Sequence, residues 1–162
     1  MAGESRTPEY LKMNPSGFVP VLQEDDFVLT EGGAILSYIA KTRKLTDWLP
    51  ADPKAQSKVN FWMHWNHTYM RQTPELKGVK EALAFMEARL GESGPFLAGT
   101  DKPTIAYLFV VPEVDQLVLF GVMELGEYPK VSAWLKAMEA ALPKYGENVQ
   151  QVKEIVASLA AK

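Results

Sequence analysis

Residues 16–35 read SGFVPVLQEDDFVLTEGGAI, and they carry the clearest structural signals in the N-terminal part of the chain. Two short runs rich in β-forming residues, 18–23 and 26–29, are separated by two acidic residues, which predicts a tight β-hairpin. From Thr30 onward the apolar residues recur with the period of a helix, and Thr30 is the expected N-cap. The stretch therefore predicts a hairpin that leads directly into an amphipathic helix.

Pro20 interrupts the first of these strands. Proline has no N–H to donate, so it is excluded from central strands. One interpretation is an edge strand or a bulge. The other is a cis peptide bond between Val19 and Pro20, which leaves the Val19 main chain free to pair with an extended ligand. The residues alone leave both interpretations open.

Glu31, Gly32 and Gly33 stand where the helix begins. The free N–H groups of a helix N-terminus attract anions, and glycine lets a ligand backbone come close. A carboxylate beside such a site can hold an ammonium group, so this combination suits a zwitterionic amino acid. The alternative is structural: Thr30 caps the helix, Glu31 complements its dipole, and the glycines loosen its first turn.

The rest of the chain predicts an all-helical domain. One or two helical turns are expected at 8–13, and the turn-rich stretch 47–53 (DWLPADP) is the expected linker between domains 1–46 and 54–162. Apolar periodicity then predicts helices over 54–71, 74–90, 104–119, 129–142 and 147–160. The expected fold class is a small α/β part followed by an all-α C-terminal helical bundle.

Composition excludes several classes of function. The 162 residues carry a net charge of −3 with dispersed basic residues, which gives no sign of nucleic-acid binding. There is no cysteine, so disulfides, thiolate metal sites and a cysteine nucleophile are excluded. His64 and His67 lack a carboxylate at matching spacing, and we expect no metal. The apolar run 105–112 is too short to cross a membrane, and a cytoplasmic protein is expected.

Four segments together resemble the glutathione transferase family, most closely its theta-like and bacterial-type branch. They are PEYLKMNPSGFVPVL (8–22), FVLTEGGAILSYIA (27–40), WLPADPKAQSKVNFWMHWNHTYMR (48–71) and PFLAGTDKPTIAYL (95–108), and they keep the family's order. The resemblance implies a partial thioredoxin-like fold, with a hairpin and helices, ahead of the helical bundle. It also implies glutathione as co-substrate, a small hydrophobic electrophile as the second substrate, and either a homodimer or a subunit of a protein assembly.

The resemblance also implies roles for individual residues. Val19 and Pro20 fall where the family pairs a main chain with the cysteinyl part of glutathione. Glu31 and Gly32 fall on the pair that holds the γ-glutamyl end, with Gly32 in place of the family's serine. Arg71 falls where theta-like members carry an arginine near the entrance of the active site.

Two segments of the family's reaction site have no counterpart in this sequence. The family begins with a strand–helix–strand unit of about 30 residues that carries the catalytic hydroxyl, but only seven residues precede Pro8. The family is also longer between Arg71 and Glu75. No catalytic residue is therefore assigned, and two functions stay open: glutathione conjugation, or a non-catalytic interaction or assembly subunit.

The missing unit would leave the FVPVL strand unpaired on one side, and an apolar edge of this kind invites pairing. Another polypeptide, a second copy of the chain, or a longer gene product would each supply the missing partner.

The start of the predicted central helix also departs from the family. Thr104 matches the capping threonine, but Tyr107 replaces the aspartate that completes the capping box. Pro112 falls inside the same helix and is expected to kink or weaken it.

Overall fold

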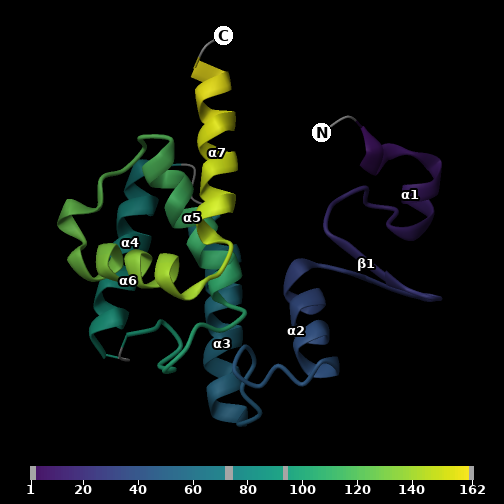
Figure 1. The fold of residues 1–162 in the computed structure, drawn as a ribbon, viewed down its shortest axis with the longest axis horizontal. Helices are drawn as coiled ribbons and strands as arrows, with labels where there is room; N and C mark the ends of the chain where they lie inside the picture. The colour runs from purple at the N-terminus through teal and green to yellow at the C-terminus, as the bar shows by residue number, and fades with distance from the viewer. Residues whose placement is uncertain (1–2, 72–74, 93–94, 161–162) are drawn as a thin grey trace. The chain divides into compact units, whose positions relative to one another are not determined.

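The computed structural model describes residues 3–71, 75–92 and 95–160. It divides into two compact units, Met1–Leu49 and Pro50–Lys162. The division falls inside the turn-rich stretch 47–53. The fold class predicted from the sequence is confirmed: a two-stranded antiparallel sheet with helices precedes a helical C-terminal domain (Figure 1).

The first unit is built around a β-hairpin. Its elements are the 3₁₀ turn η1 (Glu4–Arg6), α1 (Pro8–Met13), β1 (Val21–Glu24), β2 (Phe27–Thr30) and α2 (Gly32–Thr42). The strands pair from Val21↔Thr30 to Glu24↔Phe27, and the connecting turn places Asp25 at φ 52°. The predicted hairpin is therefore confirmed, although β1 begins only after Pro20.

Helix α2 packs on the hairpin through Tyr38. The Tyr38 and Phe27 rings lie 5.0 Å apart, and the Tyr38 hydroxyl donates a hydrogen bond of 2.7 Å to Glu24 Oε2. This hydrogen bond is the main cause that raises the pKa of Tyr38 above its ordinary value. Helix α2 is thus fixed against both strands by one aromatic side chain.

The prediction of Thr30 as the N-cap of α2 is wrong. Thr30 is the last residue of β2, where it pairs with Val21, and α2 begins at Gly32 with Glu31 in the N-cap position. Strand pairing keeps Thr30 in an extended conformation in register with β1, so its side chain is not available to cap the helix. No side chain of the described residues caps α2.

The second unit is a bundle of helices. Its elements are α3 (Pro53–Trp65), the π-helical segment η2 (Asn66–Met70), α4 (Leu76–Glu92), α5 (Tyr107–Leu119), η3 (Leu125–Glu127), α6 (Pro129–Ala141) and α7 (Tyr145–Ala160). The five predicted helices are confirmed. Within the described part of the chain, no helix is long and apolar enough to span a membrane. The shortened connection at 72–74 lies outside the described residues.

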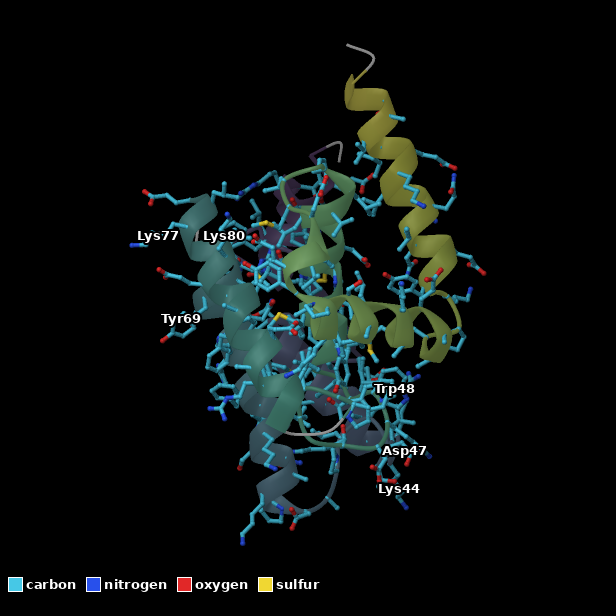
Figure 2. All side chains as sticks on the ribbon, turned by 90° about the vertical axis from the view of Figure 1, so that its left-hand side faces the viewer. Lys44, Asp47, Trp48, Tyr69, Lys77 and Lys80 are labelled. Atoms are coloured by element: carbon cyan, nitrogen blue, oxygen red, sulfur yellow. The ribbon has the colours of Figure 1, made fainter. Side chains whose placement is uncertain are left out.

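The core of this bundle is apolar and rich in aromatic side chains. Seven fully buried aliphatic side chains come from α3, α4, α5 and α6, and each contributes roughly 1.5–3 kcal/mol by its burial: Val59, Leu83, Met86, Val110, Val114, Val131 and Met138. The buried indole Nε1 of Trp62 donates to the Leu97 carbonyl at 2.6 Å, which ties α3 to the loop before α5. Tyr69 stacks on Trp65 yet lies at the outer surface, on the same side as Lys77 and Lys80 of α4 (Figure 2).

Helix α5 begins later than expected. Its first residue is Tyr107, and the buried Thr104 hydroxyl makes no hydrogen bond to any described residue. The Tyr107 ring packs against Phe96 and Trp134, so the residue in the family's aspartate position fills the core and completes no capping box. Pro112 lies inside α5, and the helix continues through it.

Candidate functional site

Asn14 organises the loop before the hairpin. Its side chain is only 6 % exposed; Nδ2 donates to the Phe18 carbonyl at 2.8 Å, and Oδ1 accepts from the Ser16 hydroxyl at 2.7 Å. The Tyr10 hydroxyl donates to the same Phe18 carbonyl at 2.6 Å. Helix α1 therefore fixes the main chain immediately before Val19.

Val19 presents its main chain to solvent. Its peptide bond with Pro20 is cis, as the second interpretation of Pro20 predicts. The residue is 59 % exposed, and within the described ranges neither its N–H nor its carbonyl has a hydrogen-bond partner. One donor and one acceptor are thus available to an extended ligand.

The hairpin register brings the two predicted parts of the site to the same end of the sheet. Val21 pairs with Thr30 as the last pair of the ladder, so Pro20 and Glu31 are the residues that adjoin the same end of the hairpin. Because adjacent strands lie roughly 5 Å apart, a ligand of a few residues reaches both the Val19 main chain and the start of α2.

Glu31 has an unusual main-chain conformation, with φ 69° and ψ 112°. Its carbonyl accepts the first hydrogen bond of α2, from the Ile35 N–H at 3.0 Å, while its side chain is exposed. Residues with a Cβ rarely adopt positive φ, and such outliers concentrate at ligand-binding sites. The conformation leaves the Gly32 N–H at the positive end of the helix without a side-chain cap.

Arg71 belongs to the second unit and has a partner there. Its Nε lies 3.0 Å from Glu113 Oε1 of α5, with the two side chains 55 % and 24 % exposed. Burial raises the pKa of Glu113 above its ordinary value, and the neighbouring guanidinium opposes that shift. The structure brings Val19, Pro20, Glu31 and Gly32 together at one end of the hairpin, whereas Arg71 stays a prediction for this site.

Asn14 and Tyr10, which support the main chain before Val19, are not predicted as site residues from the sequence. Asn14 precedes a proline, and its residue type there predicts only the end of the helical turns at 8–13, because its hydrogen bonds depend on the path of the loop that follows. An Asn before Pro-Ser-Gly is a recognisable loop-stabilising pattern, and it is the one signal that points to this role. In the part of the chain that the structure describes, no group of three or more metal-ligating side chains is assembled.

Comparison with protein families agrees with this geometry. Residues 1–41 match the family described as "Glutathione S-transferase, N-terminal domain" and residues 67–141 match "Glutathione S-transferase, C-terminal domain". The two matches keep the order of the family and together cover more than two thirds of the chain.

The chain belongs to the glutathione S-transferase family. Among curated relatives, human glutathione S-transferase theta-2B is 29 % identical over 182 aligned positions, which span 97 % of this chain and 73 % of that protein. Glutathione S-transferase theta-1 from Bos taurus is also 29 % identical, over 95 % of this chain and 74 % of that protein. The resemblance to theta-like members is thereby confirmed.

Solved structures show the same fold. Human glutathione transferase theta-2, in a complex with glutathione and an unknown ligand, matches with a TM-score of 0.86 at 25 % identity, over 98 % of this chain and 76 % of that one. A delta-class glutathione transferase from Nilaparvata lugens matches with a TM-score of 0.85 at 27 % identity, over 97 % and 83 %.

Proposed function

We propose that the first unit binds glutathione at the end of the hairpin where Val19 and Glu31 meet. The main chain of Val19 pairs with the cysteinyl residue, the Glu31 carboxylate holds the γ-glutamyl ammonium, and the Gly32 N–H binds the γ-glutamyl carboxylate. The hairpin register carries this proposal, because it sets an open main-chain donor and acceptor beside an uncapped helix N-terminus.

The affinity of this site is expected to be weak. Gly32 offers a main-chain N–H but lacks the hydroxyl of the family's serine, and one missing hydrogen bond costs roughly 1 kcal/mol. The main-chain contacts at Val19 do not depend on side-chain identity, so they are retained. We expect a dissociation constant well above the micromolar range.

Glutathione conjugation to a small hydrophobic electrophile is the reaction that this site would serve. In that reaction the glutathione thiolate attacks the electrophile, and a protein hydroxyl stabilises the thiolate. The resemblance assigns no residue of this sequence to the thiolate-stabilising position, so the roles proposed for Val19, Glu31 and Gly32 are binding and orientation. We therefore propose that turnover by the isolated chain is slow.

A non-catalytic role in a protein assembly is the second candidate function. The sheet of the first unit has two strands, so β1 offers an open edge within the described residues. Phe18 and Val19, 69 % and 59 % exposed, lie directly before this edge. An open strand edge flanked by apolar side chains favours pairing with another polypeptide. A homodimer and a cytoplasmic location stay predictions from the resemblance.

Calorimetric titration with glutathione tests the binding site. We expect weak binding that Glu31→Ala removes and that Glu9→Ala, an exposed carboxylate on α1, leaves unchanged. Micromolar affinity would contradict the expected weakness, and binding unaffected by Glu31→Ala would refute the site itself.

A conjugation assay with a chlorinated aromatic electrophile separates the two functions. Slow or undetectable turnover by the isolated chain, together with measurable glutathione binding, is the expected result. Robust turnover would exclude the non-catalytic role and would show that some group of this chain stabilises the thiolate.

A further inference from the structure

A cavity lies between α5 and α7, wholly within the second unit, where the two helices run beside each other (Figure 1). Its volume is about 220 Å³. Most of its wall is apolar, from Leu108, Val111, Leu119, Leu142, Val149 and Val152. The cavity opens to solvent beside Leu108, which is 41 % exposed. Its volume exceeds the roughly 150 Å³ that admits benzene in a buried cavity, so it has room for one aromatic ring and a short side arm.

One acidic side chain enters this apolar wall. Asp115 of α5 is half-buried, and its Oδ1 accepts a hydrogen bond of 2.6 Å from the hydroxyl of Tyr145 on α7. Among the described residues, no lysine, arginine or histidine forms an ion pair with it. An ionised carboxylate can accept about four hydrogen bonds, so Asp115 keeps unused acceptor capacity that faces the cavity.

Burial has more effect on Asp115 than any neighbouring charge. It is the largest cause that raises the pKa of Asp115, the hydrogen bond from Tyr145 lowers it, and Glu139 of α6 and Lys153 of α7 act in opposite directions, raising and lowering it. Burial and the nearby Asp115 also raise the pKa of Tyr145, so its hydroxyl remains a neutral donor. A half-buried carboxylate with one neutral partner is poorly compensated, and a bound cation would supply the missing charge.

We propose that this cavity binds a small arylalkylamine, with the aromatic ring against the aliphatic wall and the protonated amine on Asp115. The apolar wall selects the ring, and the carboxylate selects the positive charge. An anionic analogue of the same size would meet the like charge of Asp115, and a neutral analogue would gain only the apolar contact.

The proposal does not rest on the glutathione site. Every residue that lines the cavity belongs to Pro50–Lys162, whereas the proposed glutathione contacts belong to the first unit. Loss of binding at one site therefore does not imply loss of binding at the other, and the two proposals can fail independently.

Three probes of similar size and different charge test the proposal on the full chain. The dissociation constants of 2-phenylethylamine, 2-phenylethanol and phenylacetate are measured at neutral pH by ligand-observed NMR. We expect the amine to bind about tenfold or more tightly than the alcohol, because a charge-assisted hydrogen bond replaces a neutral one, and phenylacetate to bind least.

Matched variants locate the binding. Asp115→Asn keeps the size of the side chain and should reduce amine affinity about tenfold, to the level of the alcohol. Asp101→Asn, an exposed aspartate of the same unit, should change nothing. Val152→Phe narrows the cavity and should weaken the amine and the alcohol alike.

The pH dependence gives a second readout. Acidification should weaken amine binding as Asp115 takes up its proton, above the pH at which an ordinary aspartate titrates, and Asp115→Asn should remove this dependence. Equal affinity for all three probes, or full amine affinity in folded Asp115→Asn, would overturn the proposal. Failure of the amine to bind at millimolar concentration would overturn it as well.

Discussion

Replacing Glu31 by glycine should stabilise the protein while it removes the proposed glutathione site. Glu31 holds φ 69° and ψ 112°, a conformation that costs a residue with a Cβ about 1–3 kcal/mol. Its side chain is exposed and forms no capping hydrogen bond, so Glu31→Gly sacrifices no such contact. The Ile35 N–H still donates to the carbonyl of residue 31 at 3.0 Å, because that contact is between main-chain atoms.

The opposing term is the greater freedom of glycine in the unfolded chain, about 0.4–1 kcal/mol. The difference leaves a net stabilisation of about 1 kcal/mol, which corresponds to a rise in Tm of roughly 2–4 °C for a chain of this size. Glu31→Ala is the matched variant, since it also lacks the carboxylate but keeps the Cβ and hence the strain.

Urea unfolding followed by circular dichroism measures the free energy of unfolding of both variants. Amide hydrogen exchange at the β1–β2 hairpin reports on the first unit separately. We expect the glycine variant to be more stable than the alanine variant by about 1 kcal/mol, with glutathione binding lost in both. A glycine variant no more stable than Glu31→Ala would refute the argument from backbone strain.

Three further predictions concern other parts of the molecule. Asn14→Ala removes the side chain that donates a hydrogen bond to the Phe18 carbonyl, so it should lower the free energy of unfolding by about 2 kcal/mol. It should also weaken glutathione binding. Unchanged binding in calorimetry would show that this loop does not support the site. Trp62→Phe leaves the buried Leu97 carbonyl without its hydrogen-bond donor and should lower the free energy of unfolding in denaturant by about 2–3 kcal/mol. A change near zero would mean that water replaces the indole N–H. Burial raises the pKa of Glu113, so the folded state binds the Glu113 proton more tightly than the unfolded state does. The free energy of unfolding should therefore fall as the pH rises from the ordinary pKa of glutamate through the raised pKa of Glu113. Glu113→Gln should flatten that part of the stability–pH curve, and an unchanged slope would show that another group is responsible.

The local sequence pattern is sufficient to predict the strands and helices of this fold. The two β-rich runs around an acidic pair predict the hairpin because they contain side chains that pack well on a pleated, half-buried surface. Repeating apolar positions predict the helices of the second unit because the face buried in the core recurs every 3.6 residues. The residues alone leave open whether Pro20 marks an edge strand or a cis peptide bond, and the structure has the cis bond.

The first residues of α2 and α5 depend on contacts with residues outside these helices. Thr30 is a good N-cap by residue type, but pairing with Val21 keeps it in the strand. Thr104 is equally suitable, but Tyr107 packs into the core and α5 begins there. Capping preferences of about 1 kcal/mol are smaller than the free energy of strand pairing or aromatic burial, so the tertiary contacts prevail.

Sequence patterns alone predict which segments become strands and helices, and the family resemblance indicates which residues of the first unit correspond to a glutathione site. Which groups meet follows from the three-dimensional packing: Asn14 with the Phe18 carbonyl, Arg71 with Glu113, and Asp115 with Tyr145. Local patterns record the period of a buried face and the conformational preference of each residue. They do not record which face of one helix lies against which face of another, because that choice follows from the packing of the whole unit.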